Sequence, residues 1–387
     1  MSVTQYRRDK VFWLAALQTG VFGIFMGGFG PALPLLQEQQ GTSAAVAGLH
    51  GTALGLASIV AGTLNARIVH RFGRMKSVWL GLGIFNTGAL GFVLFPSAWQ
   101  TITAIFFGGI GLSITINNTF MKLTIHYADH SARATSQANG VNSAFMLIGN
   151  FIIGMIASSS VSWKLGLLLC IPFTAILYLS LGRKEEYKYI PEESGHQRGS
   201  LPMKYWISWV GMIFCISSEF AVAFWAAALL KERTFIEAAS ATTLVLAFPM
   251  GMMMGRWFGT YLFPHFDIDK RLKVIIALQG LSFIVFWVSE SVVISFIALF
   301  FVGFGTSMQF ALSTLRLLRF GKDKPDLAIG KSSLGAGFAI ALSPLFLGFL
   351  ADQFGIIKAF LFVPVLVIFA FVIVALVPSA PHESEKV

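Results

Sequence analysis

Glu219 is the residue whose type and position in this 387-residue sequence most clearly suggest chemistry. Of 18 acidic residues, it alone falls near the middle of an expected membrane span, 205–230. An acidic side chain there costs on the order of 3 kcal/mol, so such residues usually face a bundle interior or a watery cavity. We predict that Glu219 couples proton movement or binds substrate. The alternative is a protonated structural side chain that bonds a neighbouring helix.

Neutral polar residues in other apolar stretches form a second set of candidates. Asn139, Asn142 and Asn150, together with Met146, follow spacings of three, four and four, which place them on one helix face. An amide in lipid needs partners, so this face is expected toward a cavity or another helix. His50 lies inside a span and could sense pH or bind substrate, or act only as a structural hydrogen-bonding residue. The further predicted substrate-binding residues are Gln18, Asn117, Asn118, Ser218, Trp225 and Gln309.

The sequence lacks the motifs of metal binding, nucleotide binding and enzyme catalysis. Cys170 and Cys215 both fall in apolar stretches without metal-ligand spacing, so we predict no metal site. No G-x-x-x-x-G-K-[ST] loop occurs, which argues against ATP as an energy source. No catalytic triad or pair of carboxylates can be assembled within one aqueous region. We therefore expect no cofactor and no enzyme activity.

The composition predicts that lipid surrounds most of the chain. Hydrophobic residues make up 56% and charged residues only 12%, against about 25% charged in soluble domains. Lipid requires every backbone group to bond internally, which favours helices. The net charge of +10 fits the excess of Lys and Arg in the cytoplasmic loops of membrane proteins, so we expect no nucleic-acid partner.

Twelve apolar stretches of about 20 residues, the length that a spanning helix needs, follow one another along the chain. If the N-terminus is inside, Lys164, Lys231, Arg233 and Lys358 lie near outer ends, and the other 24 of 28 Lys and Arg lie on the inner side. This asymmetry supports an even number of spans with both termini cytoplasmic. The predicted spans are 12–36, 44–68, 77–96, 99–125, 133–159, 163–182, 205–230, 237–263, 272–289, 292–315, 332–350 and 357–378.

The polar stretch 183–203 divides the chain into two similar halves. We expect a six-helix bundle in 1–182, a cytoplasmic linker in 183–203 and a second six-helix bundle in 204–387. A shift of about 194 residues places matching residues of the first half on those of the second. The matched pairs are Phe107 and Phe301, Gly109 and Gly303, Gly111 and Gly305, Ser113 and Ser307, Lys122 and Arg316, Gly154 and Gly348, and Ala157 and Ala351.

The stretch 62–76 carries a local signature between the second and third spans. It resembles the G-x-x-x-D-R-x-G-R-R/K loop of the major facilitator superfamily, with Arg71, Gly73 and Arg74 matching and His70 in place of the Asp. The resemblance implies a gating loop; the alternative is that these arginines are ordinary inner-side anchors. Arg256 lies in a degenerate counterpart of this loop in the second half. Lys122 and Arg316 occupy equivalent repeat positions, either as inner-side anchors or as partners of the opposite half.

Two further stretches narrow the resemblance. Glu219 followed by Trp225 six residues later, with a pair of Asn at 117–118, is similar to fucose-permease-like members of the superfamily. The expected span 133–159 is similar to the Gly-Pro motif of antiporters, but Asn150 stands where Pro would be. Ile105 stands near the place of the arginine that is usual in drug–proton antiporters. These differences argue against a standard drug exporter.

The resemblance implies an all-α membrane protein with twelve transmembrane helices in two pseudo-symmetric bundles. We expect a monomeric secondary active transporter in the cell inner (plasma) membrane. It would move a small organic solute by alternating access, coupled to protons. A drug or metabolite efflux antiporter stays open as an alternative. A lipid translocase and a non-transporting receptor are the alternatives of another class.

Overall fold

The described residues of the chain fold into helices. The computed structural model describes residues 6–182, 199–262, 266–321 and 324–379, so residues 183–198 of the predicted linker lie outside the described part. The first half contains α1 (Lys10–Phe29), α2 (Leu33–Gln40), α3 (Ala44–Phe72), α4 (Arg74–Leu94), α5 (Ala98–Tyr127), η1 (Ala128–His130), α6 (Ser131–Ala157), α7 (Lys164–Leu167) and α8 (Cys170–Ser180). The second half contains α9 (Met203–Thr234), α10 (Ala238–Leu244), α11 (Ala247–Leu262), α12 (Ile268–Val288), α13 (Val292–Thr306), α14 (Gln309–Phe320), α15 (Pro325–Phe354), α16 (Ile356–Ala359) and α17 (Phe362–Leu376).

Most of the predicted spans appear as single long helices, and several are broken. In the described part, 11 helical stretches are long and apolar enough to cross a membrane, and Lys164–Ser180 forms a shorter one at the sixth predicted span. The predicted first span 12–36 is wrong as one continuous helix, because α1 ends at Phe29 and α2 starts at Leu33. Pro31 explains this break, since proline lacks the N–H that a continuing helix needs.

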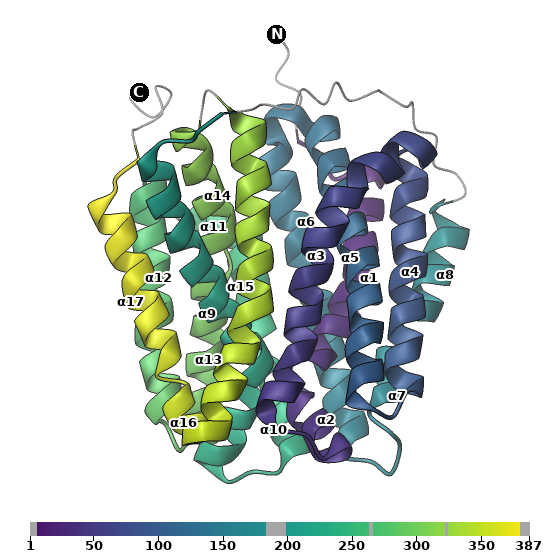
Figure 1. Ribbon diagram of the computed structural model, residues 1–387, viewed down its shortest axis with the longest axis vertical. Helices are drawn as coiled ribbons and strands as arrows, with labels where there is room; N and C mark the ends of the chain where they lie inside the picture. Colours follow the sequence, from purple (N-terminus) through teal and green to yellow (C-terminus); the bar gives the residue numbers. More distant parts are fainter. Residues whose placement is uncertain (1–5, 183–198, 263–265, 322–323, 380–387) are drawn as a thin grey trace.

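Helix packing repeats between the two halves, as the shift of 194 residues predicts. Gly109 of α5 packs against α3, and its equivalent Gly303 of α13 packs against α11. Gly111 packs against α4, and its equivalent Gly305 packs against α12. Small residues let membrane helices approach closely. Equivalent glycines therefore contact equivalent helices, which confirms two pseudo-symmetric bundles (Figure 1).

The first helix begins and the last helix ends on the same side of the molecule. The start of α1 and the end of α17 point to the same end in Figure 1, which we call the terminal end. The opposite end, with α2, α7, α10 and α16, is called the far end. An even number of membrane crossings gives this arrangement.

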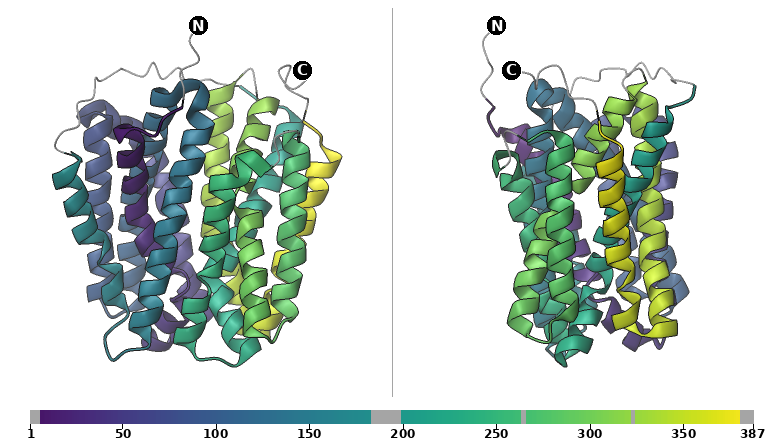
Figure 2. Two further views of the ribbon diagram at one scale, coloured as in Figure 1. Left: turned by 180° about the vertical axis from the view of Figure 1, so that it is seen from behind. Right: turned by 90° about the vertical axis from the view of Figure 1, so that its left-hand side faces the viewer.

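The two halves meet along two helix pairs. On one side, α3 packs against α15 near the far end, where Gly48 and Gly51 contact Pro344 and Gly55 contacts Ala341. These two helices diverge toward the terminal end (Figure 1). On the other side, α6 and α11 lie side by side (Figure 2, left). The contacts of α3 with α15 therefore close the halves against each other at the far end.

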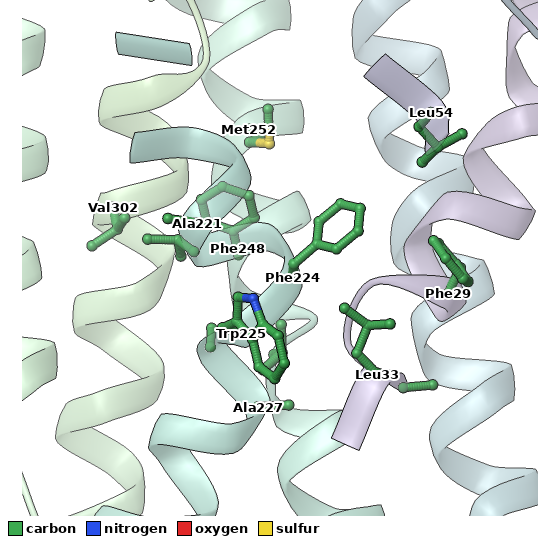
Figure 3. Packing of buried hydrophobic residues seen from close by; sticks show 14 of the residues in the cluster. Phe29, Leu33, Leu54, Ala221, Phe224, Trp225, Ala227, Phe248, Met252 and Val302 are labelled. Carbon is green, nitrogen blue, oxygen red and sulfur yellow. The ribbon is translucent and has the colours of Figure 1, made fainter. Parts of the chain in front are cut away.

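Aromatic packing between α1 and α9 also joins the halves. Phe224 of α9 packs edge-on against Phe29 of α1, with ring centroids 5.9 Å apart. Figure 3 shows Phe224 directed from α9 toward Phe29 and Leu33. Within a membrane, such a contact is stabilised by van der Waals packing between the helices.

Candidate functional site

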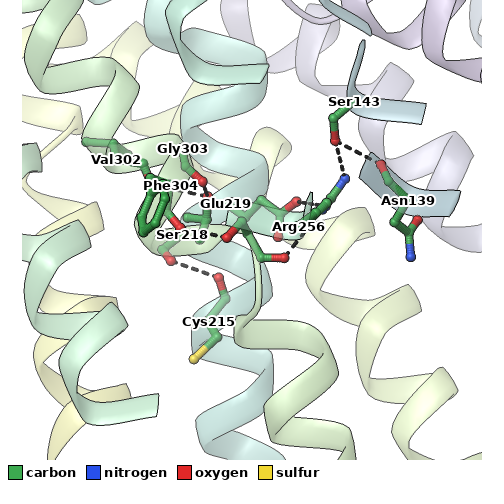
Figure 4. A network of polar contacts seen from close by, with 11 residues as sticks. Asn139, Ser143, Cys215, Ser218, Glu219, Arg256, Val302, Gly303 and Phe304 are labelled. Atoms are coloured by element: carbon green, nitrogen blue, oxygen red, sulfur yellow. Dashed lines mark hydrogen bonds and ion pairs between the residues drawn. The ribbon is translucent and has the colours of Figure 1, made fainter. Parts of the chain in front are cut away.

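An ion pair between α9 and α11 lies in the interior of the second half. Arg256 Nη2 is 3.5 Å from Glu219 Oε1, and the two side chains are 16% and 15% exposed. Glu219 lies at the middle of α9, as the sequence predicts, and Arg256 reaches it from the neighbouring α11 (Figure 4). A paired carboxylate and guanidinium lower the cost of placing either charge inside a membrane.

Arg256 is also bonded to the opposite half. Its Nη1 donates a hydrogen bond of 2.8 Å to Ser143 Oγ on α6. The Ser136 hydroxyl, two helical turns away on α6, donates a hydrogen bond of 2.8 Å to the Arg256 carbonyl. The side chain of Glu219 and the hydroxyl of Ser143 thus meet at a single guanidinium, while Ser136 bonds the backbone of the same arginine (Figure 4).

Local helix geometry explains why Arg256 fits at this position. A side chain at Gly255 would collide with Ser307, so glycine lets α11 approach the junction between α13 and α14. Carbonyls at the end of a helix lack partners within that helix. Ser307 follows the last residue of α13, and its carbonyl accepts a hydrogen bond of 3.3 Å from Arg256 Nε.

A chain of buried hydrogen bonds lies next to Glu219. Gln279 Nε2 on α12 donates to Ser218 Oγ on α9 at 3.0 Å, and Gln309 Nε2 on α14 donates to Gln279 Oε1 at 2.7 Å. All three side chains are buried. The predicted Ser218 and Gln309 are therefore brought together through Gln279, which the sequence analysis did not select.

Two predicted substrate-binding residues use their polar groups in hydrogen bonds within the protein. His50 is fully buried, with Nδ1 2.9 Å from the Ala47 carbonyl and Nε2 3.0 Å from Thr101 Oγ1. Trp225 Nε1 donates a hydrogen bond of 2.9 Å to the Pro344 carbonyl. Both residues hold helices together close to the interface of the halves.

The asparagines of α6 separate into different environments. Asn150 is buried, and its Nδ2 donates to the Gly27 carbonyl at 3.3 Å and to the Thr242 carbonyl of the second half at 3.0 Å. Asn142 packs against Gly23 of α1. Asn139 is partly exposed, and its carbonyl accepts a hydrogen bond of 3.1 Å from Ser143. Of the three, Asn139 therefore lies nearest to the bonding network of Arg256.

The remaining predicted polar residues lie in the first half. Gln18 on α1 is buried, and its Oε1 has no hydrogen-bond partner among the described residues. Asn118 on α5 is buried and links three helices, because its Nδ2 donates to Asn65 Oδ1 at 2.7 Å while its Oδ1 accepts from Arg74 at 3.1 Å. Asn117 is exposed on α5.

Comparison with known proteins decides the family. The family model described as Major Facilitator Superfamily matches residues 15–318. The chain belongs to this superfamily. A solved structure of a mutant of the nucleoside transporter NupG is similar, with a TM-score of 0.73 and 10% sequence identity. The match covers 95% of this chain and 98% of the NupG chain, and at this identity it shows the fold alone. No curated protein matches the sequence. The chain is a multi-pass membrane transporter and not an enzyme.

The loop signature of the superfamily forms a tight turn at the terminal end. Gly73 has φ +78°, a value that favours glycine, and joins α3 directly to α4. Arg74 is buried against α5 through Asn118, whereas the Arg71 guanidinium lies 5.4 Å from the ring centre of Phe72. The loop therefore ties α3, α4 and α5 together within the first half.

The predicted gating residues Lys122 and Arg316 are both buried near the terminal end. Arg316 Nε is 2.8 Å from Asp269 Oδ1 on α12, and its Nη1 donates to Ser208 Oγ on α9 at 3.2 Å. Arg316 also donates to the Val377 carbonyl. In this conformation Arg316 is thus bonded inside its own half.

Ser143 is the most important residue that the sequence analysis does not select. Serine is common in membrane helices, and a single hydroxyl gives no signal of its own. A usable signal is the spacing of Ser136, Asn139 and Ser143, which places three polar side chains on one face of α6. That face meets Arg256.

Proposed function

We propose that this chain is a proton-coupled secondary active transporter that moves a small organic solute by alternating access. The observation that carries the proposal is the position of Arg256, which pairs with Glu219 in its own half and bonds to Ser143 of the opposite half. A proton on Glu219 would remove the negative partner of Arg256. Proton binding would thereby change the bonding between the two halves.

Contacts between the halves at the far end support alternating access, because they close one side of the proposed site. Asp352 at the end of α15 accepts hydrogen bonds of 2.8 Å from the backbone N–H groups of Ala44 and Ala45, the first residues of α3. Lys231 and Glu38 form a second contact between the halves, at 2.7 Å. With the terminal end in the cytoplasm of a cell inner (plasma) membrane, this conformation is closed to the outside.

The central site favours a polar solute. The groups around Glu219 and Arg256 are hydroxyls and amides, and such groups bind the hydroxyl, amino or carboxyl functions of small metabolites. NupG, which has a similar fold, is a nucleoside transporter. We propose a monomer with one such site between the two halves.

Flux measurements on purified protein in proteoliposomes test the proposal. Solutes are first selected by thermal stabilisation of the protein in detergent, at acidic and at neutral pH. Selected solutes should then exchange across the proteoliposome membrane, and a pH gradient should drive their accumulation. Binding without exchange would contradict transport and support a receptor. Scrambling of labelled lipid without solute flux would support a lipid translocase.

A further inference from the structure

Two arginine–carboxylate pairs in the second half are built differently. Arg316 and Asp269 are 2.8 Å apart, with side chains 2% and 8% exposed, and Ser208 accepts a further hydrogen bond from Arg316. Arg256 and Glu219 are 3.5 Å apart, longer than the about 2.7–2.9 Å of a direct charge-assisted hydrogen bond, and both are more exposed. The first pair is closed. The second is looser and partly exposed.

The charge at this second pair depends on Glu219 alone. A guanidinium stays protonated in proteins, so Arg256 keeps its positive charge throughout a transport cycle. Among the ion pairs of the described residues, Glu219 is the carboxylate that faces Arg256. When Glu219 takes a proton, the site holds a net charge of +1 inside the membrane. An unpaired charge there is costly, so this state favours the entry of an anion.

Among the side chains that the structure describes, the helices around this pair supply no second negative charge. On the opposite half, the hydroxyls of Ser136 and Ser143 on α6 bond to Arg256, and the backbone carbonyl of Asn139 bonds to Ser143; all three side chains are neutral. The Cys215 thiol lies one turn from Glu219 on α9. The neighbouring groups are the neutral Gln279 on α12, which bonds to Ser218, and Ser307 between α13 and α14, whose carbonyl bonds to Arg256. Within the described residues, a balancing negative charge must therefore come from the solute.

We infer that the transported solute is a small organic monoanion whose carboxylate binds Arg256 when a proton occupies Glu219. The planar guanidinium matches the two oxygens of a carboxylate, and Ser143 and Asn139 can bond polar groups on the rest of the solute. The inference deepens the proposed function and rests on it. One proton and one monoanion move together, so transport carries no net charge and is driven by a pH gradient.

Formate tests the arginine without knowledge of the natural solute, because it is the smallest carboxylate. Full-length Glu219→Gln protein mimics the protonated state, and ¹³C-formate should bind to it with a shifted carboxylate band in isotope-edited infrared spectra. Wild-type protein at pH 8 should need at least about tenfold more formate for half-saturation, because Glu219 competes for Arg256. Binding to the wild type should strengthen as the pH falls, which provides a measurement without any substitution.

Three variants identify the binding group. The double variant Glu219→Gln with Arg256→Gln should lose formate binding, and Glu219→Gln with Arg256→Lys should keep part of it because the charge remains. Lys204→Gln, which removes an exposed cation of α9, should not change binding. Equal formate binding with and without Arg256, or wild-type binding that does not respond to pH, would overturn the inference.

Measurements of solute flux distinguish a failure of this inference from a failure of the proposed function. Proteoliposomes are given labelled gluconate and lactate, each beside its neutral amide, at membrane potentials set with potassium and valinomycin, with protein-free liposomes as the control. We expect uptake of a monoanion that follows the pH gradient and ignores the potential. If the neutral partner enters equally well together with protons, the solute class is wrong although proton-coupled transport stands. If a bound solute does not cross at all, the proposed function itself fails.

Discussion

Arg256 on α11 donates a hydrogen bond of 2.8 Å to the hydroxyl of Ser143 on α6, so the guanidinium that faces Glu219 is also bonded to the opposite half. A change of charge at Glu219 therefore acts directly on a contact that must break and reform if the halves rock. This relationship connects a local protonation event with a movement of whole bundles.

Replacement of Ser143 by alanine should slow solute exchange. The hydrogen bond to a charged group that this change removes contributes about 1.5–3 kcal/mol. We expect exchange in proteoliposomes to slow by roughly tenfold, with the pH dependence retained because Glu219 and Arg256 are intact. Ser143→Thr keeps the hydroxyl and is the matched control. Unchanged exchange in Ser143→Ala would show that the contact has no part in transport.

Asp352→Ala should open the far end, because it removes both acceptor oxygens. The carboxylate of Asp352 bonds both N–H groups at the start of α3, and loss of such a charged helix cap costs about 1–2 kcal/mol. The populations of the open and closed states should then change by roughly 5- to 30-fold. Spin labels at Val161 and Glu290, both exposed at the far end in different halves, would report longer distances by pulsed electron resonance. A distance distribution identical to that of unsubstituted protein would contradict this role.

Gly303→Ala should destabilise the second half. A methyl group at Gly303 would collide with the backbone of Phe248 on α11, and overpacking of this kind typically costs about 1–3 kcal/mol. Thermal unfolding in detergent should therefore occur at a lower temperature. At Gly83 a methyl group meets nothing within 4 Å, so Gly83→Ala should leave the unfolding temperature unchanged or raise it. Equal effects at both positions would argue against the close helix contact.

Asp269→Asn should affect stability and leave coupling intact. Removal of one partner of a buried pair costs about 3–5 kcal/mol, because Arg316 keeps an uncompensated charge. We expect a much lower unfolding temperature, with an unchanged number of protons per solute in the protein that remains folded. Asp267→Asn is the control, because Asn replaces Asp well at a helix N-cap. A changed proton ratio in Asp269→Asn would assign this pair to transport.

The fold could be predicted from the sequence because its signals are averages over many residues. The length of the apolar stretches, the distribution of Lys and Arg and the repeat of 194 residues together indicate two bundles. The helix break after Phe29 cannot be predicted in the same way. Pro31 lies within an apolar stretch, and membrane helices often contain proline. Hydropathy alone does not distinguish a kinked helix from two short ones.

The candidate site could be predicted only in part. Glu219 can be identified from the sequence because a lone carboxylate is rare in an apolar span. Its partner Arg256 is 37 positions away along the chain, and the sequence places that arginine in a loop-like motif and not beside Glu219. His50 and Trp225 have suitable chemistry, but their hydrogen bonds to Thr101 and Pro344 depend on helix packing that no local pattern encodes.

The most direct measurement of the central claim is proton movement coupled to solute movement in Glu219→Gln. Proteoliposomes loaded with a pH-sensitive dye receive an inward gradient of a solute that binds the protein. Wild-type protein and Glu232→Gln, a change at an exposed carboxylate of the same helix, should acidify the interior as solute enters. Glu219→Gln should exchange solute without acidification. Acidification by Glu219→Gln at the wild-type ratio of protons to solute would contradict the account.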